Sequence, residues 1–433
     1  MRVVDVIQKK RDGLALSDNE ISFLINGFTT GEIPDYQMAA WLMAVYYMGM
    51  DTREITQLTM AMAHSGEIMD LSAITGVKVD KHSTGGVGDK TTLVAAPLAA
   101  AAGVPVAKMS GRGLGFTGGT IDKLESISGF KVELPQSRFI DQVNKHKFAL
   151  VSQTGELAPA DKKIYALRDV TATVNSMPLI ASSIMSKKIA SGADAIVLDV
   201  KTGSGAFMKS FAQAKELAQI MVNIGKGLNI KTIAVITDMN QPLGYEIGNA
   251  NEVKEAIEVM QGNGEEDFVR LCLTIAAYMT VAGKIYTDFK LAYEKLEKML
   301  QMGTALAKFK EFITVQGGLP EITEHLEILP QASYHLPLVS DHEGYVQSID
   351  AEKAGLVAML LGAGRKRENE PIDYAAGITL RKKIGGSVKN GEELAVLHSS
   401  REISLENCQI LKDAYVIGKQ KPEKPEIIYD CIE

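Results

Sequence analysis

The sequence predicts an α/β protein in which a small all-helical domain is hinged to a larger α/β domain with a mixed, mostly parallel sheet, followed by a C-terminal β-rich (α+β) subdomain. Three observations predict it: helical signals without strands at the start, alternating β-branched runs and glycine loops in the middle, and little helical period near the end. A chain of 433 residues also exceeds what one hydrophobic core usually organises, so at least two packed units are expected.

The helical domain is predicted in two segments. In residues 1–65, Ser17 and Glu20 have capping-box spacing, Gly31 stops one helix, the Pro34-Asp35 pair opens the next, and the last helix runs from about 52 to 64. Residues 66–79 are a hinge. Residues 158–193 return to a helical pattern and are predicted to pack back onto the first segment.

The α/β domain is predicted in residues 80–157 and 194–335. Its strands are short β-branched runs before glycine loops: VKVD, VPVAKMS, FALVS, AIVLDV and TIAVIT. Residues 336–433 are predicted as an antiparallel β-rich subdomain. Its GGSVKNGEELAVL stretch is similar to biotinyl or lipoyl carrier domains but lacks their M-K-M motif, which favours a structural appendage.

Composition excludes several classes of protein. The formal net charge of −7 argues against a general binder of nucleic acid or membrane surfaces, since both need a basic face. Three distant cysteines without a C-x-x-C pair indicate neither a disulfide framework nor a zinc site. The charged N-terminus does not read as a signal peptide, and the longest apolar run is short and rich in alanine. We expect a soluble, cytoplasmic protein.

The stretch DKHSTGGVGDKTT, residues 80–92, reads as a strand (77–81), a glycine turn and a helix (about 90–102). Such a turn directs backbone N–H groups and the helix dipole at one point, which suits an anion. Ser83, Thr84, Thr91 and Thr92 add donors, and Lys81 and His82 add charge or a proton. Asp89 stands where a Walker A loop needs glycine, which disfavours triphosphates. The alternative is a plain turn with a satisfied histidine.

A second loop, KMSGRGLGFTGGTIDKLE at 108–125, follows the next strand. Its Gly113-x-Gly115-x-x-Gly118 spacing is formally a dinucleotide fingerprint, but no helix begins among the glycines and no acidic residue ends a strand about twenty positions on. Two adjacent parallel strands ending at one sheet edge would build a single pocket instead. The groups predicted to converge there on a tetrahedral oxyanion, such as inorganic phosphate, are Lys81, Ser83, Thr92, Lys108, Ser110 and Thr120.

These residues carry a family resemblance. SGRGLGFTGGTIDKLE, residues 110–125, resembles the signature of the thymidine and pyrimidine-nucleoside phosphorylases, and KHSTGGVGD, residues 81–89, resembles their phosphate loop. The likeness extends through residues 158–208 and 237–256. It implies the type II nucleoside phosphorylase fold, with the site between the two domains, a homodimer formed through the helical domain, and a phosphate site that also includes His82 and Met109.

The implied reaction is reversible phosphorolysis of uridine, thymidine and deoxyuridine to the free base and (deoxy)ribose 1-phosphate, in nucleoside salvage. Phosphate is already an anionic nucleophile, so catalysis depends on positioning and charge. The resemblance assigns Arg168 and Lys187 to the pyrimidine oxygens and Ser183 to an edge nitrogen. Spacing places Ser183 and Lys187 on one helical ridge, but periodicity alone equally fits a snorkelling lysine at a helix end.

Three further residues keep two interpretations. His82 either donates a proton to O2 of the base, which we favour, or acts as a charged or hydrogen-bonding binder. Tyr165 either touches the base or belongs to the core. Lys108 stands where thymidine phosphorylases carry methionine, and the resemblance implies that it reaches phosphate and a ribose 2′-hydroxyl. A thymidine-only phosphorylase is the alternative.

The resemblance also implies one structural potassium ion, and no organic cofactor. Its ligands would be backbone carbonyls of Gly88, Lys90, Leu243 and Glu246 and the carboxylate of Glu255, oxygens that suit a hard cation. The chain departs from the family here, because Lys90 and Glu246 stand where small or uncharged residues are common, and the Lys90 ammonium can compete with the ion. Phe116, where histidine is frequent, is a second departure.

Two other functions compete with the phosphorylase. An anthranilate-type phosphoribosyltransferase shares this fold, but it needs magnesium carboxylates, and the loops contain no Asp-Glu pair. A catalytically silent phosphate-binding protein would not need Arg168, Ser183 and Lys187.

Overall fold

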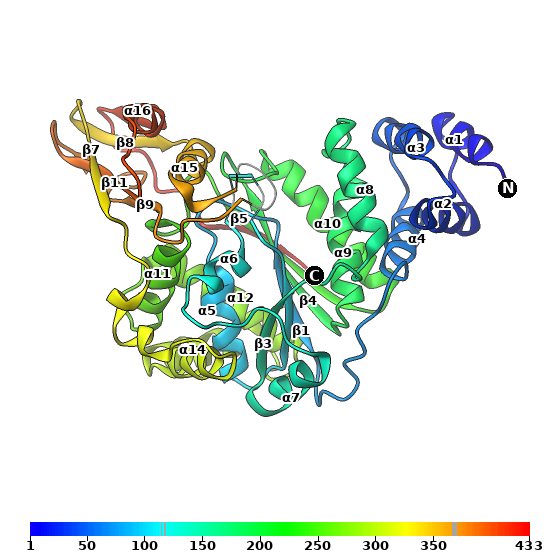
Figure 1. The fold of residues 1–433 in the computed structure, drawn as a ribbon, viewed down its shortest axis with the longest axis horizontal. Helices are drawn as coiled ribbons and strands as arrows, with labels where there is room; N and C mark the ends of the chain where they lie inside the picture. The colour runs from blue at the N-terminus through cyan, green and yellow to red at the C-terminus, as the bar shows by residue number, and fades with distance from the viewer. Residues whose placement is uncertain (114, 117, 366–369) are drawn as a thin grey trace.

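The computed structural model describes residues 1–113, 115–116, 118–365 and 370–433. Figure 1 shows the helices α1–α4 at one end, the central sheet in the middle and the C-terminal sheets at the other end. The helices are α1 (Val3–Arg11), α2 (Asp18–Thr30), α3 (Asp35–Met48), α4 (Thr52–Ala63), α5 (Thr91–Ala101), α6 (Thr120–Glu125), α7 (Gln136–His146), α8 (Pro159–Val170), α9 (Met177–Ala190), α10 (Phe211–Gly227), α11 (Ala250–Met260), α12 (Glu266–Ala282), α13 (Phe289–Gln301), α14 (Thr304–Val315), η1 (Pro320–Thr323), η2 (Leu326–Ile328), α15 (Ala351–Ala358), η3 (Met359–Ala363) and α16 (Leu405–Lys412). The strands are β1 (Val79–Ser83), β2 (Val106–Ser110), β3 (Phe148–Ser152), β4 (Ala195–Thr202), β5 (Lys231–Asp238), β6 (Glu246–Gly248), β7 (Tyr334–Val339), β8 (Gly344–Ile349), β9 (Gly377–Leu380), β10 (Ser387–Val388), β11 (Glu393–Ser399), β12 (Tyr415–Gly418) and β13 (Ile428–Ile432).

The N-terminal helices begin and end where the sequence predicts. Ser17 and Glu20 form the capping box of α2, and Gly31 ends that helix with a φ of 85°. Pro34 is the N-cap of α3. The inward faces of these helices surround the single tryptophan, Trp41, which is fully buried.

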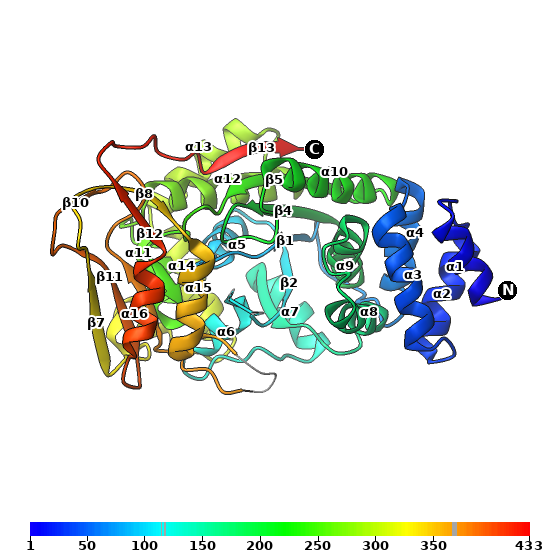
Figure 2. The ribbon, with the colours of Figure 1, turned by 90° about the horizontal axis from the view of Figure 1, so that it is seen from above.

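Helices α8 and α9 join this helical core to the sheet. Ala160, Ile164 and Leu179 belong to the same core cluster as Trp41. Further along α9, Met185 packs in a cluster with strands β4 and β5 and helix α10. Figure 2 shows α8 and α9 between the N-terminal helices and the strands. The segment that carries Arg168, Ser183 and Lys187 is therefore held from both sides.

The central sheet has the order β1-β4-β5-β13. Strands β1, β4 and β5 are parallel, and β13 pairs with β5 in the antiparallel direction, so the mixed, mostly parallel sheet is confirmed. The expected direct pairing of the two loop-bearing strands is wrong, because β2 pairs with β3 in a separate parallel ladder. Strands β1 and β2 still lie together through a bond from Val79 N to Pro105 O (3.0 Å).

The C-terminal part contains two antiparallel sheets, with orders β6-β9-β11-β7 and β10-β8-β12. Strand β6 comes from the α/β segment, whereas β13 returns to the central sheet and leaves the predicted 336–433 unit. Helices α15 and α16 begin at the capping residues Asp350 and Ser404. Each has only eight residues, so neither develops a clear helical period. No helix in the described ranges is long and apolar enough to cross a bilayer.

Candidate active site

The carboxyl end of β1 carries the first predicted anion-binding group. Lys81 is fully buried, and its Nζ has no hydrogen-bond partner among the described residues. The nearest carboxylate oxygen is Asp199 Oδ2 at 3.5 Å, and that oxygen lies closer, at 2.8 Å, to Lys201 Nζ. One carboxylate therefore lies beside two buried ammonium groups, and the N–H donors of Lys81 remain available to an anion.

The glycine turn after β1 leads into α5. Ser83 Oγ accepts a hydrogen bond from Gly85 N (3.2 Å), and Asp89 Oδ1 accepts one from Thr91 N (3.1 Å). Burial alone would raise the pKa of Asp89, but Lys81, Lys201 and Lys123 outweigh it and hold that pKa well below its usual range. Thr92 lies in the first turn of α5, at the positive end of the helix dipole, which favours an anion.

Lys108 connects the two loop-bearing strands. Its Nζ donates a hydrogen bond to the carbonyl of Lys81 and lies 3.3 Å from Asp80 Oδ1. Asp80 Oδ2 in turn binds Lys188 Nζ of α9 at 2.8 Å, and the same ammonium donates to the Met109 carbonyl (3.0 Å). Burial, together with the charges of Lys188 and Lys81, lowers the pKa of Lys108 to about 7, although Asp80 opposes this shift.

The pKa of His82 reflects the electrostatic potential of the site. Burial and four lysines, Lys188, Lys108, Lys187 and Lys81, lower the pKa of its imidazole well below 6.5. The imidazole is therefore neutral at pH 7 in the protein without ligand. The lysines come from β1, β2 and α9, so the structure brings the phosphate residues together with the helix that carries Lys187.

Lys187 is held on α9 by two groups. Its Nζ donates to Ser183 Oγ (2.9 Å) and to a carboxylate oxygen of Asp161, the first-turn acid of α8. The contact with Ser183 confirms that the two residues share a helical ridge. Asp161 is buried, and its other oxygen, Oδ1, has no partner among the described residues.

Arg168 is buried at the end of α8 and faces the α8–α9 connection. Its guanidinium donates to the carbonyls of Thr173 (3.3 Å), Val174 (2.5 Å) and Leu179 (3.2 Å) and lies 5.6 Å from the centre of the half-buried Tyr165 ring. These three carbonyls use three of its five N–H groups.

The signature loop is anchored by acidic residues of α6. Asp122 Oδ2 accepts from Gly113 N (2.6 Å), and Arg112 pairs with Glu125. Ser110 ends β2, and Thr120 is the first residue of α6. Phe116 packs near Phe207, with ring centres 6.5 Å apart. Positions 114 and 117 of this loop, which are two spacer positions of the glycine pattern, lie outside the described residues.

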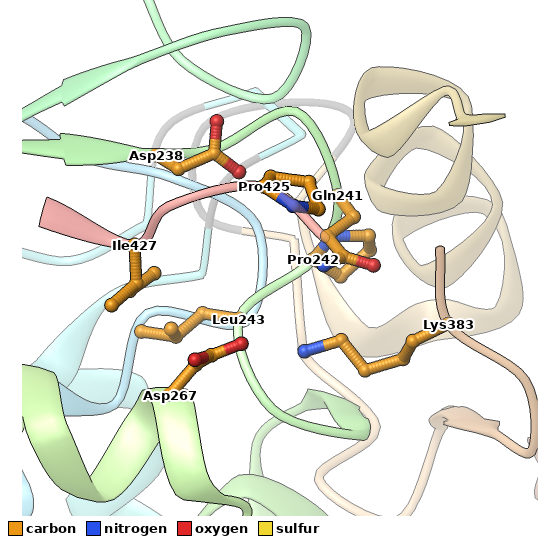
Figure 3. Close-up of a pocket in the computed structure, with 8 residues that line it drawn as sticks. All are labelled: Asp238, Gln241, Pro242, Leu243, Asp267, Lys383, Pro425 and Ile427. Atoms are coloured by element: carbon orange, nitrogen blue, oxygen red, sulfur yellow. The ribbon is translucent and has the colours of Figure 1, made fainter. Parts of the chain in front are cut away.

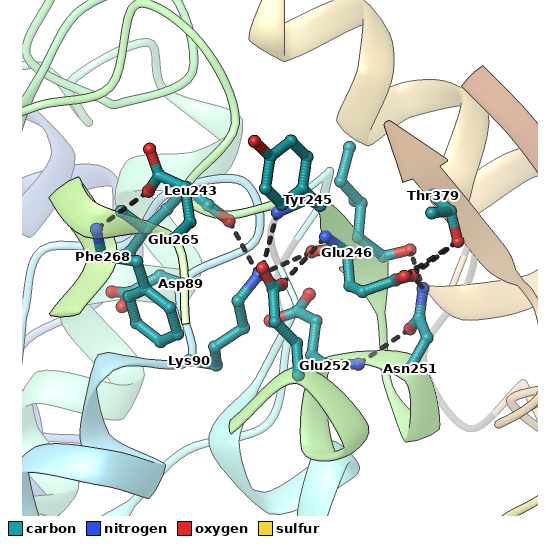
Figure 4. Close-up of polar contacts among 12 residues, drawn as sticks. Asp89, Lys90, Leu243, Tyr245, Glu246, Asn251, Glu252, Glu265, Phe268 and Thr379 are labelled. Atoms are coloured by element: carbon teal, nitrogen blue, oxygen red, sulfur yellow. Dashed lines mark hydrogen bonds and ion pairs between the residues drawn. The ribbon is translucent and has the colours of Figure 1, made fainter. Parts of the chain in front are cut away.

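The residues expected to bind potassium do come together, but a lysine already occupies their centre (Figure 4). Lys90 Nζ donates to the carbonyls of Leu243 (2.7 Å) and Glu246 (2.8 Å) and lies 2.5 Å from Glu255 Oε2. The Gly88 carbonyl accepts from Lys90 N (3.0 Å). A second cation in contact with these oxygens would meet the ammonium group, so this set does not fit a potassium ion.

A small pocket lies beyond Leu243, on the side of the 238–243 loop (Figure 3). Leu243 is the one predicted site residue in its lining. The lining consists of Asp238, Gln241, Pro242, Leu243, Asp267, Lys383, Pro425 and Ile427. This pocket is therefore separate from the lysine cluster around His82.

Sequence reasoning missed the buried charges that organise the site. Asp80, Asp161, Lys188, Asp199 and Lys201 were not predicted as functional, yet they position or balance the predicted lysines. A signal was available for three of them. Asp80, Asp199 and Lys201 interrupt apolar strand patterns in VKVD and AIVLDVK, and a charge in a buried strand needs a partner.

Three family descriptions match the chain in order. Residues 4–66 match the helical bundle domain of a glycosyl transferase family, residues 75–306 match the a/b domain of that family, and residues 345–418 match the pyrimidine nucleoside phosphorylase C-terminal domain.

Curated relatives are similar to this chain over all or nearly all of their length. The pyrimidine-nucleoside phosphorylase of Geobacillus stearothermophilus is 56% identical over 432 residues, which is 100% of both chains. That of Bacillus subtilis (strain 168) is 58% identical over 402 residues, 93% of each chain. Among solved structures, anthranilate phosphoribosyltransferase from Thermus thermophilus matches 72% of this chain and 99% of its own, with a TM-score of 0.58 and 19% identity, a likeness of fold alone.

Proposed function

The chain belongs to the pyrimidine-nucleoside phosphorylase family, and we propose that it catalyses the reversible phosphorolysis of pyrimidine nucleosides to the free base and a pentose 1-phosphate. The observation that carries this proposal is the group of four lysines that depresses the pKa of His82. Lysines gathered at the end of a parallel strand, beside a helix N-terminus, favour a small anion.

Inorganic phosphate binds at the β1 and β2 loops. Lys81 and Lys108 provide charge, and the turn, Ser83, Thr92, Ser110 and Thr120 provide donors. A phosphate oxygen forms the new bond to C1′ while the glycosidic C1′–N1 bond breaks and its electron pair leaves with the base. Phosphate neutralises part of the lysine charge, which raises the pKa of His82 and lets its imidazole hold a proton near the sugar and base.

Residues of α8 and α9 bind the pyrimidine base. Negative charge gathers on the pyrimidine as its bond to the sugar lengthens, and a fixed cation there stabilises the transition state more than the ground state. Lys187, fixed by Asp161 and Ser183, is placed for this role. The guanidinium of Arg168 binds a pyrimidine oxygen, and Ser183 binds an edge nitrogen. Tyr165 orients the guanidinium.

Substrate range depends on Lys108. Its ammonium lies between β1 and β2, where it reaches phosphate and a 2′-hydroxyl, so the enzyme accepts uridine as well as thymidine and deoxyuridine.

The test mixes the protein with each of these nucleosides, with and without phosphate, and follows base release. Phosphate-dependent release of uracil and thymine is expected. Release from thymidine alone supports the narrower specificity, whereas release without phosphate, or none, refutes the proposal.

The Lys187→Gln variant retains a donor for Asp161 and should lower kcat by about 100-fold. The exposed Lys162→Gln on α8 is the control, with unchanged kcat.

Homodimerisation through the helical domain is supported by an apolar face on α3. Tyr36 and Tyr47 are 74% and 75% exposed, and three other large apolar side chains of the helix are also exposed, namely Met43, Tyr46 and Met48. A face of this kind on a folded domain favours a protein partner, and the family resemblance favours a second copy of the chain. Light scattering should give twice the mass of one chain, about 94 kDa from the 46.8 kDa chain. A Tyr47→Glu variant should be monomeric, and a monomeric native protein contradicts the proposal.

A cytoplasmic location is supported by the three cysteines, which are all free thiols. Fractionation of producing cells should find the protein with cytoplasmic enzymes, and recovery outside the cell would contradict this.

A further inference from the structure

Lys90 makes an unusually complete set of buried contacts. The residue is 1% exposed and is the N-cap of α5, directly after the phosphate-binding turn. Its three ammonium donors meet three oxygens: two backbone carbonyls from the 243–246 segment and one carboxylate oxygen from α11 (Figure 4). No donor is left over for a ligand.

The oxygens around Lys90 Nζ are of the type that binds a monovalent or divalent hard cation. The carbonyls of Leu243 and Glu246 point at one spot. The carboxylate of Glu255 supplies the negative charge. Glu255 also accepts from Tyr245 N (2.7 Å) and Glu246 N (2.9 Å), so the carboxylate is fixed in place. A single positive charge satisfies the set, and Lys90 brings that charge covalently.

We propose that the Lys90 ammonium replaces a bound monovalent cation and ties the phosphate-binding turn to the 243–246 segment, so that this protein needs no potassium for stability or for phosphate binding. Lys90 is a positioning residue in this scheme, because it acts through the turn and does not touch the substrate.

The packing of the phosphate-binding turn explains why a fixed contact with the 243–246 segment is needed. Gly88 has a φ of 73°, and a Cβ there would lie 2.8 Å from the Leu243 carbonyl, so the turn lies directly against the 243–246 segment. A second buried lysine, Lys123 of α6, donates to the Asp89 carbonyl (2.7 Å) and pairs with Glu252 of α11 at 2.7 Å. Lys90 and Lys123 thus hold adjacent residues of the turn to acids one helical turn apart on α11.

The experiment compares the native protein with Lys90→Ala, which leaves space for an ion, and with Lys90→Met, which fills that space without charge. Thermal unfolding is measured in equal concentrations of potassium, sodium and choline chloride. The native Tm should be the same in all three salts. Both variants should lose about 5 °C or more in choline, and only Lys90→Ala should regain stability in potassium.

Phosphate KM provides the functional readout, since a purely structural lysine would not couple it to potassium. It should rise in Lys90→Ala without potassium and return toward the native value with potassium, while remaining independent of potassium in the native enzyme.

The proposal is overturned by a native Tm that rises in potassium but not choline, or by a Lys90→Ala variant that potassium does not restore. If Lys90→Ala is insoluble, calorimetry of the native protein decides: millimolar potassium binding overturns the proposal, and no binding heat supports it. Because unfolding needs no turnover, failure of the proposed phosphorolysis would leave this result unaffected.

Discussion

Replacing Asp80 by asparagine tests how the buried charges of the active site are balanced. Asp80 lies 3.3 Å from Lys108 and 2.8 Å from Lys188, and none of the three side chains is more than 3% exposed. At an effective dielectric constant of about 20, each contact contributes about 5 to 6 kcal/mol of Coulomb energy, part of which offsets the cost of burial. The Asp80→Asn variant leaves two ammonium groups without their anion. We expect the free energy of unfolding to fall by about 3 to 5 kcal/mol.

Urea denaturation followed by far-UV circular dichroism measures this loss. The control is Glu352→Gln, which breaks a contact of 2.7 Å with Lys209 between side chains that are about half exposed. This surface pair should contribute less than about 1 kcal/mol. Adding Lys188→Met to Asp80→Asn removes one unpaired charge and should recover part of the loss. Equal effects of Asp80→Asn and Glu352→Gln would refute the reasoning.

Three further predictions concern the same site. The His82 imidazole should titrate well below pH 6.5 by NMR, and phosphate should raise that midpoint; because its folded pKa is depressed, its contribution to stability is present above about pH 6.5 and is lost as the pH falls toward the folded pKa. A midpoint at or above 6.5 without ligand would contradict this. The Lys108 pKa near 7 predicts that the affinity for sulfate, a tetrahedral dianion that does not itself titrate near pH 7, has a titration near pH 7 that Lys108→Met lacks, measured by calorimetry; an identical pH profile would count against the assignment. Gly88→Ala, at a φ of 73°, should lower the free energy of unfolding by about 1 to 2 kcal/mol or more in urea, whereas Gly155→Ala, with open space around it, should change it little; equal losses would contradict the packing argument.

Local patterns predicted much of the fold because they encode local interactions. The capping box of Ser17 and Glu20 and the strand-turn-helix of residues 79–101 depend on neighbours in sequence, and both were predictable within a few residues. The pairing of β2 with β3 was not predictable in the same way. Parallel strands have no local signal for their partner, and β1 pairs instead with β4, more than a hundred residues away.

The candidate active site likewise combines features that local sequence predicts with contacts that it does not predict. The turn chemistry and the ridge of Ser183 and Lys187 follow from spacing. The partners of the buried charges do not, because Asp80–Lys188 and Lys90–Glu255 join residues that only the folded chain brings together. The sequence could indicate that Lys90 competes with an ion, but only the positions of the Leu243 and Glu246 carbonyls identify the ammonium as its substitute.

The last strand has a consequence for biosynthesis. Strand β5 pairs on one side with β4 and on the other with β13, whose residues are made about 190 positions later. During translation the outer edge of β5 therefore lacks its partner, and an unpaired edge of this kind invites pairing with other nascent chains. A ribosome that stalls before residue 428 would leave a product prone to aggregation, even though every predicted active-site residue had already been synthesised.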